Sequence, residues 1–498
     1  MKRIIIIGGG LAGLSAGCYG RMNGYQTSIF EMHSISGGVC TAWKRKGYTI
    51  DGAVNWVMGT RPGLEFYRFW EELGVAPGWK IYNHDLFLTS ENGEGKRLLI
   101  YCDADRLEQS LLEISPEDEP VIKEFTRAIR KAAKMSMPVE KPQELYGIMD
   151  QIKLIKMLVQ VGFFKKWGAL TIGDFAKRFK NSFLREMINH SFGAENPMIM
   201  LLFPLAFQHS KSAGYIIGGA LSLVGSIEKR YLTLGGEIHF NSRVVKILVE
   251  DNRAVGIRLA DGSEHRADWI VSAADGRTTI FDMLDGAYLD EKTKKKYDTP
   301  NLFQPLVYVA LGVSGALDDL PASLEGLSFP LKEPLVVAGE EKKTMNVRSY
   351  CFDPTMAPEG KTILVVQYGT DYDYWSTLRQ EPERYRAEKE KITQGVIVRL
   401  EERFPGIAAR VEMADVATPT TWERYTGNWR GSYEGWMFDS GFSPTSSMRK
   451  TLPGLGAFYM AGQWVNPGGG IPTAVMSGNH TIQMICRDDK KKFTSSKP

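Results

Sequence analysis

The chain has 498 residues and a formal net charge of +3, with 43% hydrophobic and 24% charged residues. This balance is typical of a globular protein and argues against a dedicated nucleic-acid binder, which would carry a broad basic surface. The length favours two domains, because a single hydrophobic core rarely extends over so long a chain.

The amino terminus predicts a strand, a phosphate-binding turn and a helix in direct succession. Ile4–Ile7 is a short β-branched run, typical of a parallel strand that is buried on both faces. Gly8 would allow a tight turn, Gly10 would let the backbone approach a pyrophosphate, and Gly13 would let the next helix pack closely. That helix, from Leu14 to about Gly24, would direct its amino-terminal N–H groups at the phosphates.

A second strand and an acidic residue complete the pattern of a dinucleotide-binding unit. Gln26–Phe30 predicts the strand, and Glu31 follows it directly. A carboxylate about 20 residues beyond the glycines can accept hydrogen bonds from both ribose hydroxyls of an adenosine, and it repels a 2′-phosphate. The alternative is a glycine-rich turn that binds no ligand.

The middle of the chain predicts a helical part followed by strands. After a short hairpin within 47–56, residues from about 62 to 214 are predicted to be mainly helical. Gly218-Gly219 then opens a helix that ends at Leu234-Gly235-Gly236. Further strands are predicted at 237–240, 243–247, 255–259 and 269–272, with a turn at Asp261-Gly262.

The last part of the chain returns to glycine-rich strand–turn–helix character. Strands at 305–312 and 362–367 and a helix near 381–403 come first, and 458–473 then leads into a helix to about Arg487. The final residues are charged and polar, which predicts disorder. The predicted units are a discontinuous dinucleotide domain of residues 1–75, 215–289 and 450–487, a second domain of residues 76–214 and 290–449, and a disordered tail of residues 488–498.

Separated segments of the chain together resemble one known family. Gly8–Glu31 with Gly37-Gly38, the Val244-x-x-Ile247 strand, the turn at Ala357–Gly360 and Gly462–Ala474 resemble the flavin-containing phytoene desaturase-like oxidoreductases. That group includes carotenoid desaturases, carotenoid isomerases and retinol saturases, within the wider amine-oxidase fold. The resemblance implies an α/β fold in which an FAD-binding, Rossmann-like three-layer domain carries an inserted α+β substrate domain.

The resemblance also implies which residues contact FAD. Val39 stands where the family usually has arginine, and Gln463 stands where it often has aspartate. Pro472 suits the first position of a helix, whose amino terminus favours the negative charge of reduced flavin. The implied contacts are Gly8, Gly10, Leu11, Ala12 and Gly13 with the pyrophosphate, Glu31 with the ribose, Gly38 and Val39 near the flavin-side phosphate, Val244 with the adenine, Gly462 and Gln463 with the ribityl chain, and Gly470 and Ile471 with the flavin N1–C2=O edge.

Three further segments have two interpretations each. Asn55 and Trp56 could flank the flavin ring or serve only in packing. Thr421–Tyr425 and Gly431–Tyr433 could line the substrate pocket or form an aromatic turn between the domains.

No metal site and no catalytic residue are predicted. The five cysteines are widely spaced and the seven histidines are scattered, without the pairing that binds zinc. Free thiols favour a reducing, cytoplasmic setting. We interpret His190, His209 and His480 as structural, so the acid or base of the reaction stays unassigned.

The segment 153–185 is rich in basic and aromatic residues, with Asp174 as its acidic residue. This composition suits peripheral docking on an anionic lipid surface. The alternative is that these helices cover the substrate cavity with a solvated basic face. No uncharged apolar run reaches the roughly 18 residues that span a bilayer.

The predicted function is an FAD-dependent oxidoreductase that acts on carbon–carbon bonds of a long lipophilic substrate, such as an isoprenoid, carotenoid or retinoid. A hydride would pass between a substrate C–H and flavin N5, giving desaturation, saturation or isomerisation. Oxygen, a quinone or a redox protein would exchange the electrons. The alternatives are a flavin amine oxidase and a non-catalytic lipid- or prenyl-binding protein of the same fold.

Overall fold

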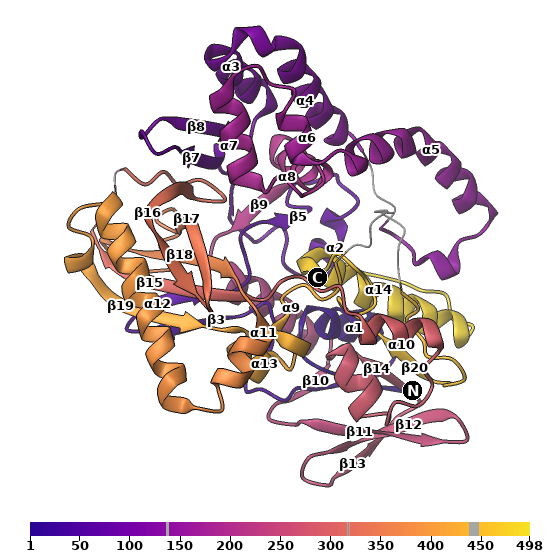
Figure 1. The fold of residues 1–498 in the computed structure, drawn as a ribbon. Coiled ribbons are helices and arrows are strands. Elements are labelled where there is room, and N and C mark those ends of the chain that lie inside the picture. Colours follow the sequence, from indigo (N-terminus) through magenta and orange to yellow (C-terminus); the bar gives the residue numbers. More distant parts are fainter. Residues whose placement is uncertain (136–138, 316, 318, 438–447) are drawn as a thin grey trace.

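The structure is a computed structural model that describes residues 1–135, 139–315, 317, 319–437 and 448–498, without the side chains of 151–159. It contains a parallel sheet of five strands in the order β10-β2-β1-β14-β20, in the lower part of the view in Figure 1. Ile4–Ile7 form one of its strands and are buried on both faces, as the β-branched run predicts. The strands are β1 (Arg3–Ile7), β2 (Gln26–Phe30), β10 (Glu237–His239), β14 (Trp269–Ser272) and β20 (Phe458–Met460).

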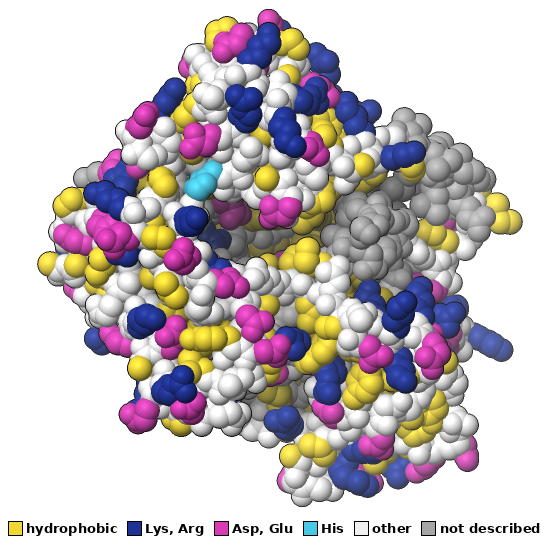
Figure 2. Space-filling model, in the orientation of Figure 1, with side chains coloured by type: hydrophobic (Ala, Val, Ile, Leu, Met, Phe, Trp, Pro, Cys, Tyr) yellow, Lys and Arg dark blue, Asp and Glu magenta, His cyan; other side chains and the backbone are white. Residues whose placement is uncertain are grey.

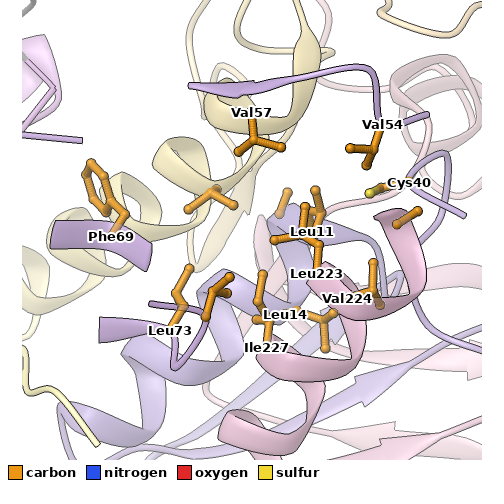
Figure 3. Packing of buried hydrophobic residues seen from close by; sticks show 14 of the residues in the cluster. Leu11, Leu14, Cys40, Val54, Val57, Phe69, Leu73, Leu223, Val224 and Ile227 are labelled. Carbon is orange, nitrogen blue, oxygen red and sulfur yellow. The ribbon is translucent and has the colours of Figure 1, made fainter. Parts of the chain in front are cut away.

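Helices cover one face of this sheet and pack closely on one another. They are α1 (Leu11–Met22), α9 (Gly219–Thr233) and α14 (Gly470–Asp488). Leu14 of α1 meets Leu223 and Ile227 of α9 in the core, beside α2 (Tyr67–Glu72) (Figure 3). A Cβ on Gly478 would lie 2.4 Å from the carbonyl oxygen of Ala12, so glycine permits the close crossing of α14 over α1.

A small antiparallel sheet packs against the other face of the parallel sheet. It consists of β11 (Val244–Glu250), β12 (Arg253–Leu259) and β13 (Glu264–Arg266). Ile247 and Ile257 from this sheet share a core with Ile5 and Ile270 of the parallel strands. Helices, parallel sheet and antiparallel sheet make three layers, which confirms the predicted α/β class and its Rossmann-like three-layer domain.

A second sheet has seven strands in the order β19-β15-β18-β17-β16-β7-β8. One of its faces packs against α12 (Pro382–Arg403) through a core that includes Val309 and Val396. The strands are β7 (Leu86–Glu91), β8 (Arg97–Tyr101), β15 (Leu306–Ser314), β16 (Leu327–Val337), β17 (Glu340–Ser349), β18 (Lys361–Gly369) and β19 (Val411–Ala417). The helices α11 (Tyr372–Leu378) and α13 (Pro419–Thr426) also belong to this part of the chain. The helix α10 (Glu291–Asp298) instead buries Tyr297 in the core that contains Ile5 and Ile270 of the parallel sheet.

The expectation that residues 62–214 are mainly helical is only partly right. Helices form the lobe at the top of Figure 1 around a separate core, but the hairpin β7–β8 leaves it and joins the seven-stranded sheet through β16. Such long-range pairing is not visible in a local pattern. The helices are α3 (Ala104–Ile114), α4 (Glu119–Ala132), α5 (Ile148–Ala169), α6 (Ile172–Ala176), α7 (Ser182–Phe192) and α8 (Ile199–His209), and the remaining short strands are β3 (Ala42–Arg45), β4 (Tyr48–Asp51), β5 (Val57–Met58), β6 (Ile81–Tyr82) and β9 (Ala213–Ile216).

The carboxyl-terminal tail differs from the predicted disorder. The ring of Phe493 packs on that of Tyr19, with the ring centroids 5.9 Å apart. Asn23 donates a side-chain hydrogen bond to the Thr494 carbonyl and accepts one from its N–H, both at 2.8 Å. One aromatic contact and polar partners that include Asn23, Glu72 and Arg230 place a segment whose composition is otherwise that of a disordered one. The proposed domain boundaries themselves stay a prediction.

Candidate functional site

A cavity of about 1310 Å³ opens between the parallel sheet and the seven-stranded sheet. It exceeds the roughly 300–1,000 Å³ of ordinary ligand pockets, so it has room for more than one small molecule. On the face seen in Figure 2 the molecule is hollowed below the helical lobe, and hydrophobic side chains are visible inside. Of the predicted contact residues the cavity is lined by Gly8, Gly10, Leu11, Ala12, Glu31, Gly38, Val39, Asn55, Trp56, Val244, Gly462, Gln463, Gly470 and Ile471.

The cavity lies at the carboxyl ends of the parallel strands. Gly8, Glu31, Ala273 and Ala461 line it, and each directly follows a strand of the parallel sheet. Open α/β sheets bind their ligands at this edge. Gly13 is the predicted contact residue that does not line the cavity, because it lies beneath the turn.

The turn after β1 leaves the amino terminus of α1 open to the cavity. Gly8 has a positive φ of 96°, and a Cβ on Gly13 would lie 2.0 Å from the Gly8 carbonyl oxygen. The helix begins at Leu11, earlier than the predicted Leu14, because extended Gly10 serves as its N-cap. No described side chain caps this end, so its N–H groups remain available for a phosphate.

Glu31 is buried and already oriented by the backbone. Its Oε2 accepts a hydrogen bond of 2.6 Å from the Gly9 N–H, and its Oε1 accepts one of 2.8 Å from the His33 N–H. Each carboxylate oxygen can accept a further bond. The side chain is therefore held in place with capacity left for ribose hydroxyls.

The carboxyl-terminal loop presents a second open helix end and an unpartnered amide. No described side chain caps α14, which begins at Gly470. Gln463 lines the cavity, and its Nε2 is buried without a hydrogen-bond partner among the described residues. A buried donor without a partner costs about 1–3 kcal/mol, which a ligand acceptor would relieve. Two open helix ends, the Gly8 turn and this amide fit a dinucleotide that spans both loops.

Buried Asp51 holds the loop that carries Asn55 and Trp56. Its Oδ1 accepts hydrogen bonds of 2.9 Å from the N–H groups of Ala53 and Val54, and its Oδ2 accepts one of 2.7 Å from Ala220. Burial raises the pKa of this carboxyl to about 6, although the three backbone hydrogen bonds act to lower it. The loop is thereby fixed to the start of α9.

The seven-stranded sheet forms a wall of the cavity that sequence reasoning missed. Side chains alternate between its two faces, so Tyr308, Gln367 and Arg348 project from β15, β18 and β17 into the cavity, while their neighbours pack on α12. A polar residue within an apolar strand, as in Val365-Val366-Gln367, is the signal that could have found this wall. The segments Thr421–Tyr425 and Gly431–Tyr433 contribute residues to the lining of the cavity. That they contact the substrate stays a prediction.

Glu434 is a second residue that the sequence did not reveal. It lines the cavity, and its Oε1 lies 3.6 Å from the position a Cβ on Gly470 would take, so it lies beside the amino end of α14. Its carboxyl has no hydrogen-bond or ion-pair partner among the described residues, and burial raises its pKa to about 7. Such a group exchanges a proton readily near neutral pH.

A model of the family described as flavin containing amine oxidoreductase matches residues 11–483. The chain belongs to this family. It is a flavin-dependent oxidoreductase.

Relatives of this flavin-containing oxidoreductase extend over nearly its whole length. A phytoene desaturase (neurosporene-forming) of Rhodobacter capsulatus is 26% identical over 97% of this chain and 94% of its own. A chloroplastic prolycopene isomerase of Daucus carota is 24% identical over 97% of this chain and 80% of its own. The crystal structure of an oxidoreductase from Methanosarcina mazei has a TM-score of 0.58 at 18% identity, covering 97% of this chain and 100% of that one, which shows the fold.

The structure describes the side chains of only part of the segment 153–185, because those of 151–159 are left out. In the described part Phe163, Trp167 and Phe175 are buried in the lobe core, and Lys166 and Arg178 pair with Glu124. None of the described residues of this segment lines the cavity, so lipid docking and the solvated cover of the cavity both stay predictions. No helix among the described residues combines the length and apolar character needed to cross a bilayer.

The three histidines considered above as an acid or base lie outside the cavity. His190, His209 and His480 do not line the cavity, and the Nε2 of His480 lies 2.8 Å from the Val139 carbonyl oxygen. In the part of the chain that the structure describes, no group of three or more histidine, cysteine or acidic side chains is placed to share a metal ion.

Proposed function

We propose that this oxidoreductase uses FAD to act on carbon–carbon bonds of a long lipophilic substrate of the isoprenoid or polyene class. The observation that carries the proposal is that one continuous cavity includes both the dinucleotide residues and the wall of the seven-stranded sheet. The cavity therefore extends from the predicted cofactor residues to a second wall. The names of the relatives, a phytoene desaturase and a prolycopene isomerase, support the substrate class.

FAD, when bound, supplies the hydride acceptor or donor of the reaction. The residues of this chain would hold it by both ends. Glu31 would accept the adenosine ribose hydroxyls, and the N–H groups at the start of α1 would bind the pyrophosphate. Gln463 would donate to the ribityl chain, and the amino end of α14 would favour negative charge at the flavin edge.

Glu31→Gln is expected to lower FAD affinity by about ten- to a hundredfold, because bonds to a charged acceptor contribute about 1.5–3 kcal/mol. The amide keeps the size of the side chain but loses one acceptor. Fluorescence titration of the flavin-depleted protein measures this, with FMN as the control because it lacks the adenosine. Equal FAD affinity in variant and wild type would remove Glu31 from the ribose site.

We further propose that Glu434 moves the proton that accompanies the hydride. Its oxygen borders the amino end of α14, which we assign to the flavin edge, and its carboxyl faces the cavity without a described partner. The loop that carries it is firm, since Ser432 accepts a bond of 3.0 Å from the Gly435 N–H and donates one of 3.2 Å to the Gly435 carbonyl. Glu434 can donate a proton to a substrate carbon when neutral and accept one when ionised.

The proposal is tested by anaerobic photoreduction of the purified holoenzyme followed by addition of polyenes, retinoids and quinones. We expect at least one polyene or retinoid to reoxidise the flavin faster than buffer does, or to reduce oxidised flavin. If none does either, the polyene assignment is wrong. Hydrogen peroxide released with amines would instead indicate the amine oxidase, and a purified protein without flavin absorbance would indicate the non-catalytic lipid-binding alternative.

A further inference from the structure

Arg348 is a buried cation in the wall of the substrate cavity. It belongs to β17, lines the cavity, and is only 7% exposed. A Cβ on Gly326 would lie 2.8 Å from its Cγ, so the stem of the side chain is pressed against this backbone. Burying a guanidinium costs several kcal/mol unless an anion or several acceptors compensate it.

The described partners of Arg348 leave part of that cost uncompensated. One guanidinium nitrogen, Nη2, donates to the Oε1 of Gln367, which is a neutral acceptor. The other, Nη1, is buried and has no hydrogen bond among the described residues. Nη1 forms a long ion pair with Glu325, whose Oε2 lies 3.9 Å away, but at that distance the two groups share no hydrogen bond.

Tyr433 supplies a second donor in the same region. The other tyrosines around the guanidinium are already bonded, since Tyr308 donates to the Asp51 carbonyl and Tyr350 donates to Asn55 Oδ1. Tyr433 lines the cavity and has no hydrogen-bond partner for its hydroxyl in the described part of the chain. Burial raises the pKa of Tyr433, and Glu434 and Glu325 add to this while Arg348 opposes it, so the hydroxyl stays a neutral donor.

We propose that the substrate is a lipid acid whose carboxylate is bound by the Nη1 of Arg348 and the hydroxyl of Tyr433. This inference rests on the proposed function and names its substrate class more closely. One guanidinium nitrogen and one hydroxyl suit a single carboxylate. A diphosphate would need more cations, and Glu325 and Glu434 nearby disfavour a multiply charged head group.

The test is fluorescence titration of the holoenzyme with cis-parinaric acid, a conjugated polyene acid, and with its methyl ester. The two share a chain and differ in charge. We expect the wild type to bind the acid at least tenfold more tightly than the ester. Arg348→Met should lower affinity for the acid by about ten- to a hundredfold, the range of a charge-assisted bond, and leave the ester within twofold.

Two further variants keep the test decisive if Arg348→Met does not fold. Tyr433→Phe should lower the affinity for the acid about threefold to tenfold and leave the affinity for the ester unchanged, as expected for the loss of one neutral hydrogen bond. Arg379→Met is the matched control, because Arg379 lines the cavity but donates to the Thr420 carbonyl. It should keep the preference for the acid.

Equal binding of acid and ester by the wild type would overturn the inference, as would an equal loss of both in Arg348→Met. If polyenes exchange electrons with the flavin but show no preference for a carboxylate, this inference is wrong and the proposed function still stands. If no polyene, acid or ester, exchanges electrons with the flavin, the proposed function itself is wrong.

Discussion

Gly13→Ala is expected to abolish flavin binding. The added Cβ would lie 2.0 Å from the Gly8 carbonyl oxygen and 3.3 Å from the Ile6 side chain, so the turn between β1 and α1 must move. Such overpacking against backbone costs about 3 kcal/mol or more. We expect the ratio of flavin to protein to fall at least tenfold, measured as flavin released by denaturing the purified variant.

Gly225→Ala is the matched control for this variant. Gly225 is an exposed residue inside helix α9, and a Cβ there would meet nothing within 4 Å. The same substitution should stabilise the protein by about 0.5–1 kcal/mol, because alanine has the higher helix propensity. A Gly13→Ala protein that keeps its full flavin content would show that the turn does not bind the cofactor.

Replacing Glu434 is expected to remove a titration near neutral pH from the chemical step. Because burial raises the pKa of Glu434 to about 7, the side chain is mostly neutral well below that pH and mostly a carboxylate well above it. A reaction that adds hydrogen to the substrate needs the neutral acid, so its rate should fall as the pH rises through 7. A desaturation needs the carboxylate, so its rate should rise.

Glu434→Gln cannot ionise, and we expect its single-turnover rate to fall by about 10²–10⁴ and to lose this titration. Glu423→Gln is the control, since Glu423 also lines the cavity but accepts a bond from the Tyr372 hydroxyl. It should keep the wild-type pH profile. An unchanged profile in Glu434→Gln would assign the proton to another group.

The parts of the site that sequence predicts well are those whose interactions are local. Ile4–Ile7, the Gly8 turn and Glu31 form one strand–turn–helix–strand unit, so a short stretch of sequence contains every partner that shapes it. The start of α1 was placed too late because an extended glycine can serve as an N-cap, which adds a helical turn before Leu14. Residue spacing alone does not distinguish these two starts.

The parts that were missed depend on pairing between distant segments. Arg348 faces the cavity only because β17 lies beside β18 with one register, and a shift by one residue would turn it toward α12. Glu434 owes its place to a loop that packs on the start of α14, where the Gly468 N–H donates to the Trp436 carbonyl at 2.9 Å. Neither relationship leaves a periodic signal in the sequence.

Two distant parts of the chain contribute strands to the seven-stranded sheet, and this has a consequence for how the protein is made. The hairpin β7–β8 leaves the ribosome long before β16, the strand that pairs with its edge. Until then the nascent chain presents an unprotected strand edge, which is a template for mispairing with other chains. Because β7 is made before its partner β16, this hairpin is a place where chaperones would be needed, and deleting residues 290–449 would leave its edge permanently prone to aggregate.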